Sequence, residues 1–383
     1  MKLALECARF LKNNKITRDI SFPYPYMCQM HSYQISEFEE ENLEDVFFDS
    51  LREDYICFND WFCKKITQRE KAYIYRDRDG IQAFLYIKKN ESEAVGNLTD
   101  TPKMKIGTIK ICDSSKGNRL GEGAICIALW EWQRSDLDQI YLTVFEKHDS
   151  LIKLLKDFGF KEGGFKGKEV VLYRDKNKIS YELPKTSFPY IDPGFNRGGY
   201  VPIEAKYHDG LFPYSKLKNV SSSAEFAMAA SNGITKIFIA APYKKADFLP
   251  GDVIFIYRKS EEKQNRTYKS VVTSFCNLIS CTSIKEENEE KMSLKEFLIL
   301  IGNKSILTEE ELNTMYSKSR NLYALTMLYN GFFGCGNNVN HHNLKTNSLM
   351  EGHPYEVKLN RDEIIKLMNL GRKNVQDFTF NKA

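Results

Sequence analysis

The sequence lacks the features that mark several classes of protein. Its nine cysteines are scattered and none forms a Cys-x-x-Cys pair, which is typical of reduced thiols rather than of a disulfide framework or a zinc ribbon. No apolar run approaches the roughly 20 residues of a membrane-spanning helix. Glu6 and Arg9 interrupt the segment where a secretory signal needs an apolar core. We therefore predict a soluble, cytoplasmic protein with no membrane partner.

The sequence also lacks a strong excess of charge. Its formal net charge is +4 over 383 residues, which neither requires nor excludes a polyanionic partner, so any nucleic-acid surface must be local. This length suits about two domains, each with its own core. His341 and His342 lie near Cys335 but no second pair of ligands is visible, so we predict no metal site.

A polar stretch with three glycines, Asp113–Ala124, is the most informative part of the chain. Residues 105–111 before it alternate as a strand does, and residues 124–132 after it have apolar side chains at helical spacing. Glycine lets another group approach the main chain closely, and the first amides of a helix have no partner within the helix. The stretch therefore has the outline of a phosphate-binding turn, although glycine turns also serve as plain connections.

The surrounding elements have a definite expected order. A helix over 39–68 follows a strand that begins at 26. A hairpin, a strand, the glycine turn and four further elements come next. The expected elements are a hairpin of 71–76 and 81–87, a strand over 105–111, the helix after the turn, a strand over 139–145, a helix from Asp149 to Gly159, and a strand over 169–174.

This order resembles the GNAT family of acetyl-CoA-dependent N-acetyltransferases over residues 26–175. The family's turn carries Gln/Arg-x-x-Gly-x-Gly/Ala, matched here by Asn118-Arg-Leu-Gly121-Glu-Gly123, and its late helix ends in Gly-Phe, matched by Gly159-Phe160. The resemblance implies a mixed sheet and acetyl-CoA as the cofactor. The residues that it implies for coenzyme binding are Ile109, Ile111, Lys116, Asn118, Arg119, Leu120, Gly121, Glu122, Gly123 and Ala124.

Three positions depart from the family pattern. Asn118 replaces the usual Gln or Arg, His148 stands where many members have an asparagine that contacts the coenzyme, and Leu155 stands where a tyrosine is often proposed to protonate the leaving thiolate. Coenzyme binding therefore looks retained, while the usual acid is missing.

Amide formation from a thioester needs a neutral amine, a polarised carbonyl and a route for one proton. The resemblance implies that strands 105–111 and 139–145 separate where the pantetheine enters. His148 is the first candidate base because an imidazole is poised near neutral pH, and Asp113 is the second. Tyr173 could replace the missing tyrosine. The alternatives are a surface histidine that caps a helix, a loop-capping aspartate and a tyrosine that faces the core.

Residues 179–220 are rich in proline, glycine and aromatics and are predicted to form an ordered linker after a first domain of 1–178. The second domain, 221–383, resembles the PUA-like superfamily, ASCH or EVE type, through a helix and a strand that precede Pro250-Gly251-Asp252-Val-Ile-Phe-Ile-Tyr257-Arg258. This resemblance implies a small β-barrel and RNA or another nucleic acid as a partner. Basic side chains interleaved with tyrosines are the candidate contacts, namely Lys236, Lys244, Arg258 and Tyr257, although a solvated barrel surface would look much the same.

The predicted fold class is α+β, with a mixed-sheet GNAT-like domain followed by a small PUA-like barrel with helices. The predicted function is transfer of an acetyl group to an amine, with RNA such as tRNA or aminoacyl-tRNA presented by the second domain. Two alternatives stay open: an acetyltransferase of protein or DNA base amines in a toxin-antitoxin or defence setting, and a catalytically silent module on a nucleic-acid-binding protein.

Overall fold

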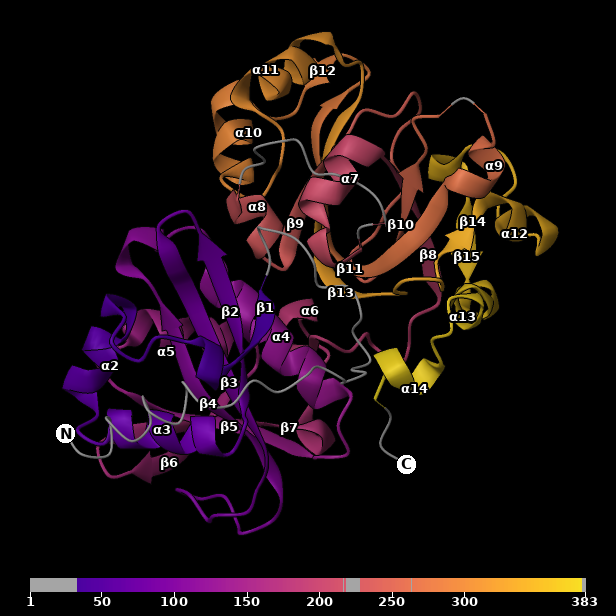
Figure 1. The fold of residues 1–383 in the computed structure, drawn as a ribbon. Helices are drawn as coiled ribbons and strands as arrows, with labels where there is room; N and C mark the ends of the chain where they lie inside the picture. Colours follow the sequence, from indigo (N-terminus) through magenta and orange to yellow (C-terminus); the bar gives the residue numbers. More distant parts are fainter. Residues whose placement is uncertain (1–32, 216, 218–227, 263, 381–383) are drawn as a thin grey trace.

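The computed structural model describes residues 33–215, 217, 228–262 and 264–380. Within these residues the chain is an α+β protein with two mixed sheets, which lie in separate halves of the molecule (Figure 1). The fold class is therefore confirmed in its coarse form. The predicted strand that begins at residue 26 lies outside the described residues as far as residue 32. No helix in the described ranges is both long enough and apolar enough to cross a membrane.

The first sheet has seven strands in the order β1-β2-β3-β4-β5-β7-β6. All neighbours are antiparallel except β4 and β5. The strands are β1 (Gln34–Glu37), β2 (Lys71–Asp77), β3 (Gly80–Glu91), β4 (Lys103–Ile111), β5 (Gln139–Phe145), β6 (Lys161–Lys166) and β7 (Glu169–Asp175). The hairpin, β4, β5 and β7 confirm the sequence prediction, while β6 was not predicted.

Helices cover both faces of this sheet. One face carries α4 (Leu120–Gln133) and α5 (Asp149–Asp157), and the other carries α2 (Asp49–Asp54) and α3 (Phe58–Thr67). The single helix predicted over 39–68 is wrong, since the segment forms short helices separated by turns. Alternation along β5 explains the two cores: Ile140, Leu142 and Val144 join the α4 side, whereas Tyr141 packs on the opposite face.

The second sheet follows the path β15-β8-β10-β11-β13-β9, with β12 and β14 paired to β11. No pairing among the described residues closes this path into a ring, so the predicted barrel is open in this structure. The strands are β8 (Arg197–Glu204), β9 (Thr235–Ala240), β10 (Val253–Lys259), β11 (Val271–Glu286), β12 (Glu289–Glu290), β13 (Leu322–Phe332), β14 (Val339–Asn340) and β15 (Lys358–Asn360).

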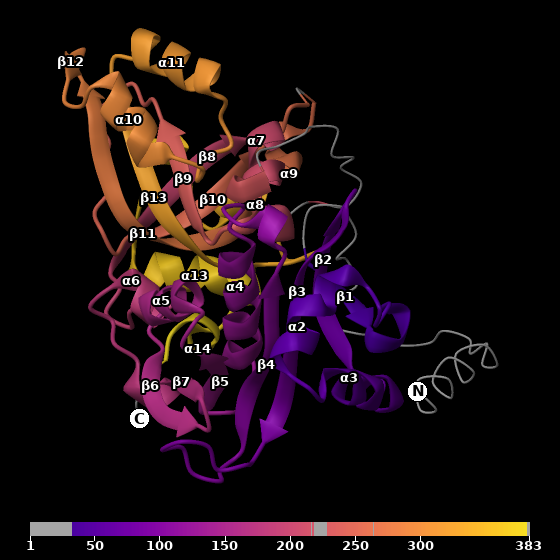
Figure 2. The ribbon, with the colours of Figure 1, turned by 90° about the vertical axis from the view of Figure 1, so that its left-hand side faces the viewer.

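The helices of the second half lie around this sheet (Figure 2). They are α6 (Pro184–Ser187), α7 (Ala205–Leu211), α8 (Met228–Asn232), α9 (Arg266–Lys269), α10 (Leu294–Ile301), α11 (Glu309–Lys318), α12 (His341–Thr346), α13 (Arg361–Leu370) and α14 (Val375–Phe378). A capping box begins α11, with Thr308 and Glu311 each bonded to the backbone of the other. His341 is the first residue of α12.

The predicted linker of 179–220 requires a correction. Residues 197–204 form β8, which pairs with β10 in parallel and with β15 in antiparallel fashion. The second unit therefore includes residues well before 221. Prolines and glycines gave this segment the composition of a linker, yet Pro202 is tolerated because no strand among the described residues pairs with the outer edge of β8 at that position.

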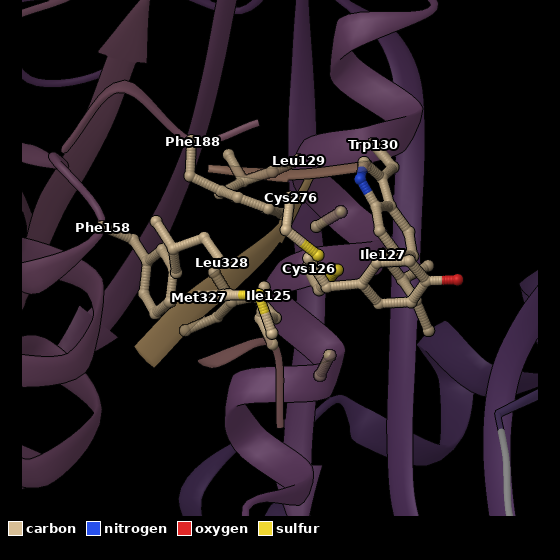
Figure 3. Close-up of a cluster of buried hydrophobic side chains, with 14 of the residues drawn as sticks. Ile125, Cys126, Ile127, Leu129, Trp130, Phe158, Phe188, Cys276, Met327 and Leu328 are labelled. Atoms are coloured by element: carbon tan, nitrogen blue, oxygen red, sulfur yellow. The ribbon is translucent and has the colours of Figure 1, made fainter. Parts of the chain in front are cut away.

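One hydrophobic core joins the two halves. Side chains of α4, such as Cys126 and Trp130, pack against Cys276 of β11 and Met327 and Leu328 of β13 (Figure 3). The indole N–H of Trp130 also donates to the carbonyl of Asn330 at 2.7 Å. Because α4 is buried on both sides, it is apolar around most of its circumference.

Candidate active site where two strands separate

The strands β4 and β5 are paired at one end only. Met104 is paired with Ile140 and Lys105 with Tyr141, and no further pair between these strands occurs up to Ile111 and Phe145. Backbone groups on the facing edges are thus left without ladder partners in the separated part. This is the separation that the sequence resemblance implied, and it lies next to the glycine turn that follows β4.

His148 lies just beyond the wide end of this separation. It follows β5 and precedes α5, and its ring is 45% exposed. Its Nε2 lies 3.8 Å from Oδ2 of Asp54, the last residue of α2, and Lys147 bonds the other oxygen of that carboxylate. The structure therefore adds Asp54 as a polar neighbour of the His148 ring. Sequence reasoning missed Asp54 because the contact joins residues 94 positions apart.

A second polar group faces the same end of the sheet. The hydroxyl of Tyr55 donates to Glu169 at 2.8 Å, and the other oxygen of Glu169 accepts from Thr143 of β5 at 3.0 Å. Burial, followed by the hydrogen bond to Glu169, raises the pKa of Tyr55 well above its usual value. The phenol therefore stays protonated and acts as a donor. No local pattern in the sequence indicates this group, because Tyr55 and Glu169 are 114 positions apart.

The other two predicted catalytic residues lie elsewhere. Asp113 is 88% exposed and bonds Lys116 at 2.6 Å, and this hydrogen bond lowers the pKa of Asp113, which weakens it as a base. Tyr173 is paired with Tyr141, at the end where β4 and β5 are joined, whereas Glu169 is paired with Phe145 at the wide end. Four residues along a strand span about 13 Å. We therefore correct the assignment of Tyr173, because its strand position is distant from the wide end.

The glycine turn presents two sides. On one side, a Cβ at Gly121 would lie 3.5 Å from Leu154 of α5 and 3.9 Å from Ile111 of β4, so this side faces the strand separation. The first turn of α4 includes the amides of Leu120 and Gly121, which have no acceptor within the helix. Gly117 has a φ of +90° and open space around it. These groups, with the exposed Lys116, fit a bound pyrophosphate.

The other side of the turn contacts the second half of the chain. Arg119 bonds Glu122 at 2.7 Å and donates to the carbonyl of Thr235 at 2.6 Å, while Glu122 accepts from the amides of Ile234 and Thr235 at 3.1 and 2.7 Å. Burial alone would raise the pKa of Glu122, but Arg119 and the Thr235 amide hold it below its usual value. A Cβ at Gly123 would lie 2.8 Å from the carbonyl oxygen of Asn232.

These contacts correct part of the predicted coenzyme site. The side chains of Arg119 and Glu122 are only 9% and 12% exposed and bind each other and β9, so they are not available to a phosphate. Ala124 is buried in the core, and the backbone carbonyl of Asn118 accepts from Asn232 at 3.0 Å. The coenzyme prediction therefore retains backbone amides of the turn, Lys116, and the half-buried Ile109 and Ile111.

Leu155 stands where the family pattern often has a tyrosine. Its side chain is fully buried in the core that α5 shares with the sheet. A leucine in this place offers no proton, so any donor to a leaving thiolate has to come from another residue.

The predicted nucleic-acid contacts lie mostly inside the second half. Lys236 of β9 is fully buried and donates to the carbonyls of Ala230 and Ser231 at 2.7 and 2.9 Å. Tyr257 is 6% exposed and bonded to His341. Of the four predicted contacts, only Lys244 is an exposed cation, and it pairs with Glu356. Side chains buried in this way cannot reach a surface polyanion, which corrects the assignment of Lys236 and Tyr257.

Arg258 belongs to a buried polar network instead. Its guanidinium donates twice to Asp209 of α7, at 2.8 Å in both bonds, and Asp209 is also 2.7 Å from Nδ1 of His208. Nε2 of His208 lies 2.8 Å from the hydroxyl of Thr273. Burial alone would raise the pKa of Asp209, but its bonds to Arg258 and His208 hold it well below its usual range. Arg258 is therefore a structural residue, and its nucleic-acid role is corrected.

No protein-family model matches the chain, and no curated protein matches it. Several solved structures do. An ASCH protein from Zymomonas mobilis matches 45% of this chain and 94% of its own at 12% identity, with a TM-score of 0.30. A GNAT-family acetyltransferase from Streptococcus agalactiae matches 34% and 79% at 14% identity and a TM-score of 0.27. The N-acetyltransferase PseH from Campylobacter jejuni matches 37% and 97% at 15% identity and a TM-score of 0.27.

These matches come from the two families that the sequence resembles, and each covers part of the chain.

Proposed function

We propose that the protein is an N-acyltransferase that uses acetyl-CoA. The observation that carries the proposal is the separation of β4 and β5, which opens between the amides that follow the glycine turn and the pair of His148 and Asp54. Acetyl-CoA supplies a thioester whose acyl carbon accepts an amine nucleophile. Backbone amides of the first turn of α4, with Lys116, hold the pyrophosphate, and unpaired amides of β4 hold the acyl carbonyl.

His148 has two tasks in this proposal. As the amine forms the new C–N bond, the imidazole takes the proton that the nitrogen loses. As the C–S bond breaks, the same imidazolium returns the proton to the sulfur, which replaces the tyrosine absent at Leu155. Asp54 is a positioning residue that orients the ring.

The test is transfer of labelled acetyl groups by His148→Ala. We expect kcat to fall by roughly 100-fold, the usual contribution of a general base, with coenzyme affinity nearly unchanged. Asp54→Asn should lower kcat less than His148→Ala does and leave KM nearly unchanged, because the ring loses only the neighbour that orients it. His353→Ala, at an exposed histidine far along the chain, is the matched control. Full activity in His148→Ala would remove the assignment of the base.

For the acceptor, we propose an amine on RNA. The support is an exposed surface on α9 and α12 where the rings of Tyr268 and His342 lie 5.2 Å apart beside Arg266 and Lys345. Stacking rings beside cations suit single-stranded nucleic acid. Incubation with labelled acetyl-CoA, total RNA and total protein identifies the acceptor by the fraction that carries label. Label in protein would replace RNA as the acceptor. Label in neither fraction, with RNA binding retained, would indicate a silent module.

A further inference from the structure

The second sheet leaves a cleft where a barrel would close. A cavity of about 480 Å³ lies between the C-terminal part of β8 and the edge of β9, with walls from α7 and α11. Its lining includes Pro202, Ile203, Tyr207, Phe238, Ile239 and Met315. The cavity has the size and apolar lining of a ligand site.

The edge of β9 offers unpaired backbone groups to this cleft. In the ladder with β13, Ile237 is opposite Thr326 and its N–H donates outward, to the carbonyl of Lys304 at 3.1 Å. Because directions alternate in an antiparallel pair, the N–H of Ile239 also points outward. No residue in the described part of the chain accepts from it. Buried amides without an acceptor are rare, so this one indicates a missing partner.

The rest of the β9 edge is already covered. The outward amide and carbonyl of Thr235 bind Glu122 and Arg119, as an adjoining strand would. The available length is therefore short and begins at the carbonyl of Ile237. On the facing side, β15 pairs with β8 only as far as Gly199, so the outer edge of β8 beyond it is unpaired among the described residues. The two free edges face one cleft.

The charge at the cleft is acidic. Three carboxylates, those of Glu204, Glu310 and Glu311, line it against one cation, Lys259, which lies 3.5 Å from Glu204. Glu311 is occupied by the hydroxyl of Tyr207 at 2.7 Å and by the N-terminus of its own helix, whereas Glu310 is exposed. An occupant with positive side chains at the rim is favoured over a negative one.

We propose that this cleft binds an extended peptide segment with alternating apolar and basic residues, which adds as a strand along β9. Its backbone bonds Ile239 and Ile237, its apolar side chains contact Phe238 and Met315, and its basic side chains meet Glu204 and Glu310. Main-chain bonds supply affinity in this mode, and alternate side chains supply specificity. The site is separate from the acyltransferase site and does not depend on it.

The experiment uses the full chain and three probes: a short capped peptide of alternating valine and lysine, its valine and glutamate counterpart, and free lysine amide. Binding is followed by fluorescence anisotropy and by hydrogen exchange at the amide of Ile239. We expect the lysine peptide to bind and to slow exchange at Ile239, and the glutamate peptide to bind roughly tenfold more weakly, because rim charge pairs contribute about 1 kcal/mol each.

Two variants test the acidic rim and the amide of Ile239 separately. Glu310→Lys should weaken the lysine peptide roughly five-fold, while Glu44→Lys, an equal charge change on an exposed residue of the first half, should leave its affinity unchanged. Ile239→Pro should abolish binding, since proline has no N–H. If that variant does not fold, the exchange at Ile239 in the native protein decides. Absence of peptide binding, unaltered exchange, or equal binding of lysine amide without a change at Ile239 would each overturn the proposal.

Discussion

The stability of the protein should depend on pH through Lys236. Burial, then the positive charge of Arg119, lowers the pKa of this lysine from 10.5 to about 7 in the folded state. An unfolded chain keeps the ordinary value, so between about pH 7 and 10.5 the unfolded state binds a proton that the folded state has lost. The free energy of unfolding therefore rises with pH in this range, by about 1.4 kcal/mol per pH unit.

Stability rises with pH because the pKa of Lys236 is lowered in the folded state. Below about pH 7 both states carry the proton, and the folded state bears the whole cost of burying the charge, which is on the order of 5 kcal/mol. This cost of burying the charge falls as the pH rises above the folded pKa, because the folded lysine becomes neutral. Cys126 and Cys276 nearby act in the opposite direction, because burial raises the pKa of each thiol and their contribution is lost as pH rises through the range where an unfolded cysteine ionises, around pH 8.5.

The assay compares the wild-type chain with Lys236→Met by urea unfolding at a series of pH values from about 7 to 8.5, below the cysteine range. The variant leaves the carbonyls of Ala230 and Ser231 without a donor, which costs about 1–3 kcal/mol for each at every pH. That offset cancels in the slope. Subtracting the two curves should leave a rise of about 1.4 kcal/mol per unit, and parallel curves would refute the reasoning.

Other substitutions test the joint between the halves and the polar network. Gly123→Ala should lower the free energy of unfolding by about 1–3 kcal/mol, because its Cβ would press on a backbone oxygen 2.8 Å away; Gly121→Ala, with ordinary contacts, is its control. Trp130→Phe should cost about 1–2 kcal/mol by removing the indole donor, and no loss in denaturant melts would argue against that bond. Asp209→Asn should cost about 3–5 kcal/mol by leaving Arg258 unpaired, and should flatten the loss of wild-type stability that we expect as pH falls below about 4.

Strong local patterns made part of the fold predictable. The limits of β5 agree with the sequence prediction because apolar side chains alternate clearly along this segment. The segment of β8 was not predicted as a strand, because Gly198, Gly199 and Pro202 give it the composition of a linker. It is a strand because β10 and β15 pair with it, which is information from distant residues.

The candidate site was predictable only where a motif was local. The turn and His148 follow from neighbouring residues, whereas Asp54 meets His148 through the packing of α2. Lys236 alternates with apolar neighbours as a surface lysine would. It is buried because α8, whose carbonyls accept from its ammonium, and the rings of Phe212 and Tyr329 cover its side of β9, and no feature within its own segment indicates that.

The ion pair of Arg119 and Glu122 also bears on the order in which the chain folds. An exposed strand edge is a template for association with other chains, and this pair covers the outer edge of β9 at Thr235. During synthesis the first half leaves the ribosome earlier, so α4 can present a finished edge cap before β9 appears. If the second half is made alone, that edge is bare and α4 no longer covers Cys276 or Met327. The first half therefore covers a strand edge and an apolar face that the second half alone would expose.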